Sequence, residues 1–334
     1  MAYLKKPAKF SHSKLNNYDG CPFRYKINYV DKHSVFAESL ATEGGTLLHA
    51  TEEKMFNLLK EKQPINYDEM IDFYQNSYIP KKDPFDHEGG VIGINFLKER
   101  YKDDYFEVND SGQSYHNKAQ DYMKYGIHRL ETYLKENPDL EPVQAEKFFS
   151  FTYKDKILSG YIDRIFHNTK TDEYIIEDIK TKDHPFKEED LATPLQFVIY
   201  TLALEECMNI PRDKITCVYD LPFVGIKQQA GTKGYMDRGL KKLDKIFEGI
   251  EAKDYTPKPS PLCHWCAFSP TNPNQVEEAK GYCPYYSLWT PQIRTHQLAN
   301  KWQGIAKNDE IVEKERKKIE RKKANGADKF NFDF

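Results

Sequence analysis

The sequence lacks any long apolar run, and this lack argues against a membrane-embedded protein. No stretch of the 334 residues approaches the roughly 18 apolar residues that a membrane-spanning helix needs. Residues 1–14 contain lysines but no apolar segment behind them, which is not the pattern of a secretory signal. We therefore expect a cytoplasmic protein without a membrane partner.

The sequence also has no excess of basic residues. It contains 49 Lys and Arg and 52 Asp and Glu, which give a net charge of −3. A protein that coats nucleic acid is expected to be strongly basic, so that class is disfavoured. An enzyme that holds its substrate through metal ions and a local groove remains compatible with this charge. Aromatic residues make up 14% of the chain, enough to fill a core and leave rings on which bases could stack.

No Gly-x-x-x-x-Gly-Lys-[Ser/Thr] phosphate loop occurs, so the chain encodes no motor ATPase of that type. If DNA must be unwound, a separate helicase does it. Disulfides are not expected inside the cell, where the six cysteines are better explained as free thiols or metal ligands. No internal repeat is visible.

The periodicity of apolar residues divides the chain into a mostly helical first part and a later part of strands and helices. From Ser11 to about Lys135 it predicts mostly helices, among them 43–62 and 117–136, with a Pro- and Gly-rich connection over 63–91. Strands are then predicted over 142–153, 157–167, 172–182 and 214–224, and helices over 191–210 (amphipathic) and 237–253. This order predicts an α/β fold, a mixed sheet flanked by helices. The expected divisions are a helical N-terminal region (1–140), a core (141–256), a Cys-rich patch (257–290), and a charged helix with a flexible tail (291–334).

The informative block is GYIDRI (Gly160–Ile165) followed by IIEDIKTK (Ile175–Lys182). Side chains two residues apart share one face of a strand, so Asp178 and Lys180 project together, and Asp163 can meet them across the hairpin. Carboxylates bind Mg²⁺ or Mn²⁺, which polarise a phosphoryl oxygen and lower the pKa of a water, while a lysine stabilises developing charge. Taken alone, Asp-x-Lys is also a common surface ion pair.

Three further motifs surround this block. The opening SHSKLNNYDGCPFRYKINY (Ser11–Tyr29) resembles Ser-x-Ser-x-Leu-x-x-Tyr…Cys-Pro-x-x-Tyr, GGTLLHATEE contains a Gly-x-x-x-His helix ending at His49, and Gln196 and Tyr200 form Gln-x-x-x-Tyr. With the terminal cysteines, the ordered series resembles the PD-(D/E)XK nuclease superfamily in its RecB-type branch. That branch includes the nuclease domains of helicase–nuclease recombination machines and iron–sulfur nucleases of CRISPR adaptation.

The resemblance implies a restriction-endonuclease-like core and an enzyme that hydrolyses DNA with the help of metal ions. It implies an exonuclease that acts on single strands or ends, in recombination, repair or replication in a prokaryote or phage. It implies these residues: catalytic Asp163, Asp178, Lys180, Gln196 and Tyr200; metal ligands His49, Asp163, Asp178 and the carbonyl of Ile179; and Glu146 as an accessory acid. Glu177 should point to the opposite strand face. Taken singly, His49 could be a core histidine and the Gln–Tyr pair could be helix packing.

Cys263-x-x-Cys266 and Cys283 lie near the C-terminal end, and Cys21 lies in the opening motif. Four thiolates can hold a [4Fe–4S] cluster or a zinc ion. The resemblance favours iron–sulfur, with a structural role. The 16 residues between Cys266 and Cys283 exceed the family's usual gap and keep zinc open, with His264 as a potential ligand. Cys207 and Cys217 are expected to be buried.

Two other interpretations concern the end of the chain and the class of function. The basic run 314–323 could contact phosphates or be a solvated helix face, and the tail 325–334 could dock onto a replication or recombination partner. The alternative to an enzyme is a non-catalytic DNA- or helicase-binding module of the same fold, with the metal cluster as a scaffold. Such a module would be expected to lack one of the three central residues.

Overall fold

The computed structural model describes residues 9–33, 38–80, 90–109, 112–260, 263, 266–269, 282 and 283. The chain divides into two compact units: one of residues 1–12 and 38–242, the other of residues 13–37 and 243–334. The divisions expected at 140, 256 and 290 stay predictions. His264, the basic run 314–323 and the tail 325–334 lie outside the described residues.

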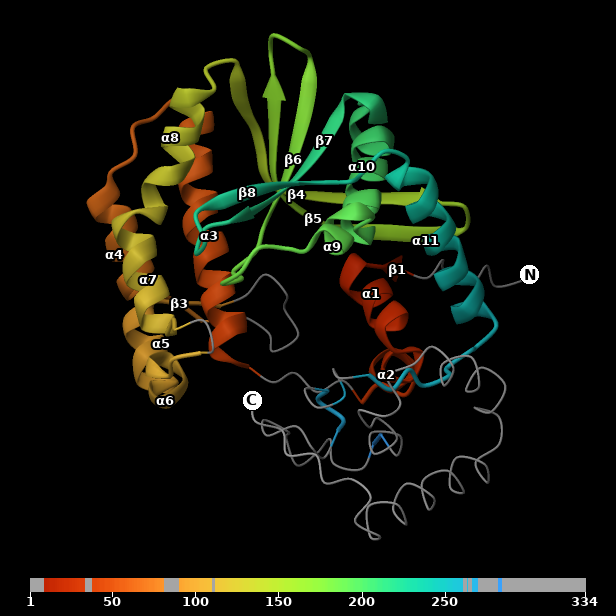
Figure 1. Cartoon of the computed structure of the whole chain (residues 1–334). Helices are drawn as coiled ribbons and strands as arrows, with labels where there is room; N and C mark the ends of the chain where they lie inside the picture. Colours follow the sequence, from red (N-terminus) through yellow and green to blue (C-terminus); the bar gives the residue numbers. More distant parts are fainter. Residues whose placement is uncertain are drawn as a thin grey trace, which may run out of the picture. The chain divides into compact units, whose positions relative to one another are not determined.

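A six-stranded mixed sheet forms the centre of the first unit (Figure 1). Its strands are β1 (Lys9–Phe10), β4 (Leu140–Tyr153), β5 (Lys156–Asn168), β6 (Glu173–Ile179), β7 (Ile215–Leu221) and β8 (Ile226–Ala230). The order is β1-β5-β6-β7-β8, and β4 also pairs with β5. The pairs β1–β5 and β6–β7 are parallel and the other pairs antiparallel. The predicted mixed sheet of an α/β fold is therefore confirmed.

The long hairpin of β4 and β5 sets the register of the site. Ala145 pairs with Arg164 and Lys147 with Ile162, so Glu146 lies opposite Asp163. The ladder between β5 and β6 begins at Arg164 and Glu177, one residue beyond Asp163. Because the side-chain period of a strand is two, this register separates Asp163 from Arg164 onto different faces.

Helices cover the sheet on both sides (Figure 1), with α3 on one side and α10 on the other. The helices of this unit lying between β1 and β7 are α3 (Leu40–Lys60), α4 (Tyr67–Asn76), α5 (Ile94–Arg100), α6 (Lys102–Phe106), α7 (Tyr115–Lys124), α8 (Arg129–Glu136), α9 (Glu188–Ala192) and α10 (Leu195–Met208). The first of them, α3, begins with a capping box in which Ser39 and Thr42 satisfy each other's backbone N–H groups. Its apolar face packs on the sheet, where Phe56 and Phe166 rings lie 5.2 Å apart.

The helix α10 differs from its prediction in two ways. It begins after Pro194, which lies at the N-cap, and α9 is a separate helix, so the expected helix 191–210 is divided. Its residues from Leu195 to Leu204 are all buried, so it is not amphipathic. One reason is close packing on a second side: a Cβ on Gly239 would lie 2.2 Å from a methyl of Val198. A helix that is apolar all round is expected when it is covered all round.

Three other predictions needed correction. The expected helix 117–136 is divided into α7 and α8 by a 3-10 turn, Gly126–His128. The expected connection 63–91 contains α4 and a short hairpin of β2 (Tyr78–Ile79) and β3 (Val91–Ile92), while residues 81–89 lie outside the described part. The short strand β1 and the edge strand β8 were not predicted. No helix within the described residues is both long and apolar enough to cross a bilayer.

The second unit combines segments from both parts of the chain. It holds most of α1 (His12–Gly20), then α2 (Pro22–Tyr25), the π-helical turn Lys26–Val30 and the last residues of α11 (Tyr235–Glu251). The hydroxyl of Tyr18 donates to the carbonyl of Asp254 at 2.6 Å, and the Tyr18 ring meets Tyr25 edge-on at 5.3 Å. The opening motif is thus anchored to residues more than 200 positions later.

Candidate active site

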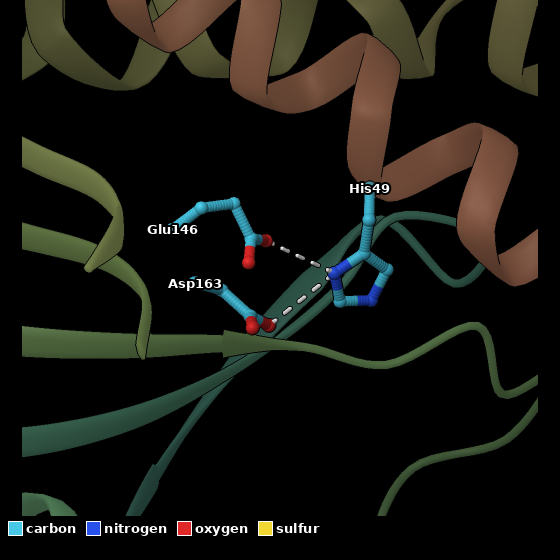
Figure 2. Close-up of side chains that lie close together, drawn as sticks. All are labelled: His49, Glu146 and Asp163. Atoms are coloured by element: carbon cyan, nitrogen blue, oxygen red, sulfur yellow. Dashed lines mark ion pairs between the residues drawn. The ribbon is translucent and has the colours of Figure 1, made fainter. Parts of the chain in front are cut away.

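Three side chains from three elements converge at the middle of the β4–β5 hairpin (Figure 2). His49 projects from α3, Glu146 from β4 and Asp163 from β5. The Nδ1 atom of His49 lies 3.6 Å from Asp163 Oδ2 and 3.8 Å from Glu146 Oε1. One ligand atom from each residue lies within 4.8 Å of the others. We call these three residues the metal-ligand group, because a histidine and two carboxylates so close together suit a divalent cation.

The backbone of Glu146 is unusual for a strand. Its φ is +42°, in the left-handed region that residues with a Cβ rarely adopt. The regular pairs on either side, at Ala145 and Lys147, hold it in this conformation. Such outliers persist where the surroundings over-determine them, often at functional sites. Glu146 was expected only as an accessory acid, yet it lies directly with His49 and Asp163.

The negative charge of the group acts on His49. Burial alone lowers the pKa of His49, but the carboxylates, Asp163 first, outweigh it and raise the pKa to about 9. Without a cation, the imidazolium therefore balances the carboxylates at neutral pH. This strongly negative surrounding is what a bound divalent ion would neutralise.

Asp178 and Lys180 form the second half of the site. The Lys180 Nζ lies 2.5 Å from Asp178 Oδ2, and Asp178 is only 1% exposed while the lysine side chain is 33% exposed. Burial raises the pKa of Asp178 above its ordinary value despite the lysine. Burial lowers the pKa of Lys180, but Asp178 and Asp163 outweigh this effect and raise it, so the ammonium stays charged at neutral pH.

Asp163 links the two halves of the site. Its Oδ2 accepts a hydrogen bond of 2.6 Å from the backbone N–H of Ile179, the residue between Asp178 and Lys180. This bond fixes the carboxylate of β5 against the strand β6. The carbonyl of Ile179 and the carboxylate of Asp178 stay predictions as metal ligands, and neither belongs to the metal-ligand group as defined above.

Gln196 and Tyr200 lie one turn apart on α10 and reach the same site. The Gln196 amide donates to Asp178 Oδ1 at 2.5 Å and also lies 2.8 Å from the Tyr200 hydroxyl. Both side chains are buried. The structure therefore brings the Gln-x-x-x-Tyr motif against Asp178, where it orients the carboxylate.

Comparison with known proteins gives this arrangement a family. A sequence profile described as the PD-(D/E)XK nuclease superfamily matches residues 9–271, most of the chain. The chain belongs to the PD-(D/E)XK nuclease superfamily. The mixed sheet of this superfamily member carries Asp163 on β5 and Asp178 on β6, and Lys180 directly follows the end of β6. The family and the mixed sheet together confirm the expected restriction-endonuclease-like core.

Three proteins that resemble this superfamily member share 10–25% of their residues with it. It is 25% identical over 283 residues to the gene 69 protein of Mycobacterium phage D29, covering 80% of this chain and 97% of that protein. A solved structure named "Putative exonuclease", from Eubacterium rectale, matches 78% of this chain and 87% of its own, with 10% identity and a TM-score of 0.41. The solved protein SSO0001 matches 54% and 81%, with 20% identity and a TM-score of 0.27.

A buried set of charges lies on the other face of the sheet, and the sequence did not reveal it. Arg164 is 1% exposed and contacts Glu52, Glu177 at 3.5 Å and Asp220 at 3.2 Å. Arg129 lies 2.8 Å from Asp220, and Lys227 lies 2.6 Å from Glu177. We call the six residues the ion cluster; they are Glu52, Arg129, Arg164, Glu177, Asp220 and Lys227. As expected, Glu177 points away from the metal-ligand group.

In the second unit, four cysteines line one cavity: Cys21, Cys263, Cys266 and Cys283. Phe23, Ile27 and Phe268 form its apolar wall. No disulfide joins any two of the six cysteines, all of which lie within the described residues. Of the remaining two, Cys217 is buried as expected, while Cys207 is exposed and that prediction was wrong.

Proposed function

We propose that this protein is a Mg²⁺- or Mn²⁺-dependent deoxyribonuclease, acting as an exonuclease on single strands or DNA ends in recombination, repair or replication. The observation that carries this proposal is the metal-ligand group beside the Asp178–Lys180 pair. Membership of the PD-(D/E)XK nuclease superfamily supports it. In the proposal, DNA is the substrate, and a separate helicase or a recombination or replication protein is a potential partner. The phage relative supports a phage or prokaryotic cytoplasm as its location.

The donor set fits a divalent cation, because one imidazole and two carboxylates offer ligand atoms within 4.8 Å of one another. His49, Glu146 and Asp163 would hold it, with Asp178 as a further carboxylate nearby. The chemistry that such an ion supplies is neutralisation of phosphate charge and a lowered pKa for a water. His49 must lose its proton to act as a ligand.

Lys180 supplies a positive charge that does not depend on a bound ion. Its ammonium rests on Asp178 while a third of the side chain remains exposed, so a phosphate oxygen can reach it. There it would stabilise charge that develops during hydrolysis or orient the attacking water. Gln196 keeps Asp178 in place through the 2.5 Å hydrogen bond, and Tyr200 in turn contacts Gln196.

The direct test is incubation of the full chain with end-labelled single-stranded and double-stranded DNA. We expect cleavage with Mg²⁺ or Mn²⁺ and none in EDTA. Release of mononucleotides or short fragments from the labelled end would indicate an exonuclease. No cleavage of either substrate with either metal would overturn the enzyme proposal and favour the binding module of the same fold.

Gln196 contacts the carboxylate of Asp178 and does not belong to the metal-ligand group. Gln196→Ala is expected to lower the cleavage rate about 10- to 100-fold, the usual cost of losing a group that orients a ligand. Steady-state rates on single-stranded DNA would measure the effect. Gln229→Ala, at an exposed position of β8, is the matched control and should keep the wild-type rate. Equal rates for both variants would contradict the role of Gln196.

We further propose that the four cysteines of the second unit hold a [4Fe–4S] cluster with a structural role. The four cysteines line one cavity, and four thiolates are the ligand set of such a cluster. Zinc is the alternative, since four thiolates also satisfy a tetrahedral ion.

The second prediction separates these metals. Protein purified without oxygen is expected to be brown and to contain about four iron and four sulfide per chain. Cys263→Ser should lower the iron content, while Cys207→Ser, an exposed thiol outside the cavity, should not. A colourless protein with about one zinc per chain would decide for zinc.

A further inference from the structure

Two exposed aromatic rings lie side by side on the β4–β5 hairpin. Phe148 and Tyr161 are register partners, and their ring centroids are 5.2 Å apart with an interplanar angle of 56°. Phe148 is 53% exposed and Tyr161 37% exposed. Their neighbours Phe149 and Ile162 are buried. Phe149 faces Tyr200 of α10, so the exposed rings, which we call the aromatic pair, occupy the opposite face of the hairpin.

The aromatic pair is close to the metal-ligand group along both strands. Phe148 follows Glu146 by two residues, and Tyr161 precedes Asp163 by two residues. At the rise of a β-strand, two residues span about 7 Å. Two residues further along lies another register pair, Ser150 and Ser159. The hairpin therefore presents carboxylates, then aromatic rings, then hydroxyl groups in succession.

This succession matches the parts of a nucleic-acid strand. Exposed rings stack with bases, and every base has a face that can stack. Hydroxyl groups are common donors to phosphate and sugar. Bases within a duplex are already stacked and hydrogen-bonded, so only unpaired bases are available to the rings.

We propose that the aromatic pair is a stacking platform for unpaired bases of a strand whose phosphate lies at the metal-ligand group. This inference rests on the proposed function, and it names the single strand, or an end that has been opened, as the substrate form. Phe148 and Tyr161 are positioning residues for the strand. They take no part in proton transfer or in binding the cation.

A cross-strand aromatic pair also stabilises a hairpin without any ligand, so a purely structural role has to be distinguished from base stacking. Binding experiments separate the two. The probes are a fluorescein-labelled oligodeoxythymidylate, an abasic strand of the same length, and a duplex. Fluorescence anisotropy of the full chain in EDTA reports affinity without cleavage.

The wild type is expected to bind the oligodeoxythymidylate more tightly than the abasic strand. Phe148→Ala and Tyr161→Ala should each weaken oligodeoxythymidylate binding about 5- to 100-fold and leave abasic binding unchanged. Phe148→Tyr should retain binding, because it keeps the ring. Tyr125→Ala, which removes a 61% exposed ring from the C-cap of α7, is the control and should bind as the wild type.

The platform would be overturned if the wild type bound the base-containing and abasic strands with equal affinity. It would also be overturned if the alanine variants lost the same affinity for both strands. These outcomes are independent of the proposed hydrolysis. If no DNA is cut but the base-dependent losses appear, the nuclease proposal fails and the platform stands. If DNA is cut but the alanine variants bind as the wild type, the platform fails and the nuclease proposal stands.

Discussion

Asp163→Asn is expected to lower the rate of DNA cleavage at least about 10³-fold, well beyond the 10- to 100-fold loss typical of a residue that only supports a ligand. The amide has nearly the same shape as the carboxylate and can still accept the hydrogen bond from Ile179, so the fold should persist. The substitution removes one of the two carboxylate charges that lie beside His49 in the metal-ligand group. An amide oxygen is also a poorer ligand for a hard cation than a carboxylate oxygen.

The measurement is the initial rate on end-labelled single-stranded DNA over a range of Mg²⁺ and Mn²⁺ concentrations. Asp155→Asn is the control, since this carboxylate lies 77% exposed in the turn of the same hairpin. It should cut at the wild-type rate. If the circular dichroism spectrum of Asp163→Asn matches that of the wild type, the loss of cleavage does not come from unfolding. Wild-type cleavage by this variant would remove Asp163 from the site.

The sequence predicted the parts of the site that depend on spacing within one element. Alternation along the predicted strand 172–182 placed Asp178 and Lys180 on one face, and their side chains meet at 2.5 Å although β6 ends at Ile179. One helical turn separates Gln196 from Tyr200, and their side chains touch. The strands β4, β5, β6 and β7 were placed well for the same reason, because period-2 patterns of apolar residues are local.

Features that depend on pairing between distant elements were not predictable in this way. Glu146 joins His49 and Asp163 through its register and a left-handed φ, neither of which its residue type reveals. The edge strand β8 has the sequence IKQQA, whose polar residues show no alternation, and it is defined by pairing with β7. Arg164 in GYIDRI gave no signal of burial, because charged residues are seldom buried unless partners from elsewhere balance them.

Those partners mean that the loss of Arg164 should strongly destabilise the protein. The ion cluster contains three positive and three negative side chains, and Arg164 alone contacts all three carboxylates. Tyr122 also donates to Glu52 at 2.6 Å, so the cluster joins α3, α7 and the sheet. Arg164→Met fills a similar volume but leaves carboxylates in the interior without their shared cation. Breaking a buried ion pair from one side costs about 3–5 kcal/mol.

We therefore expect Arg164→Met to lower the free energy of unfolding by about 3–5 kcal/mol, measured by urea denaturation followed by far-ultraviolet circular dichroism. Arg212→Met is the matched control: Arg212 makes a bidentate pair with Glu205 at 2.6 and 2.9 Å, but at the surface, where such a pair contributes less than about 1 kcal/mol. Adding Glu52→Gln to Arg164→Met should recover part of the loss, because it removes one of the stranded charges. The control is the effect of Glu52→Gln on the free energy of unfolding in the otherwise wild-type protein. If Glu52→Gln lowers the free energy of unfolding by the same amount in the Arg164→Met variant, the two effects are additive. Uncompensated charge is then not the cause of the loss, and the role of Arg164 is packing.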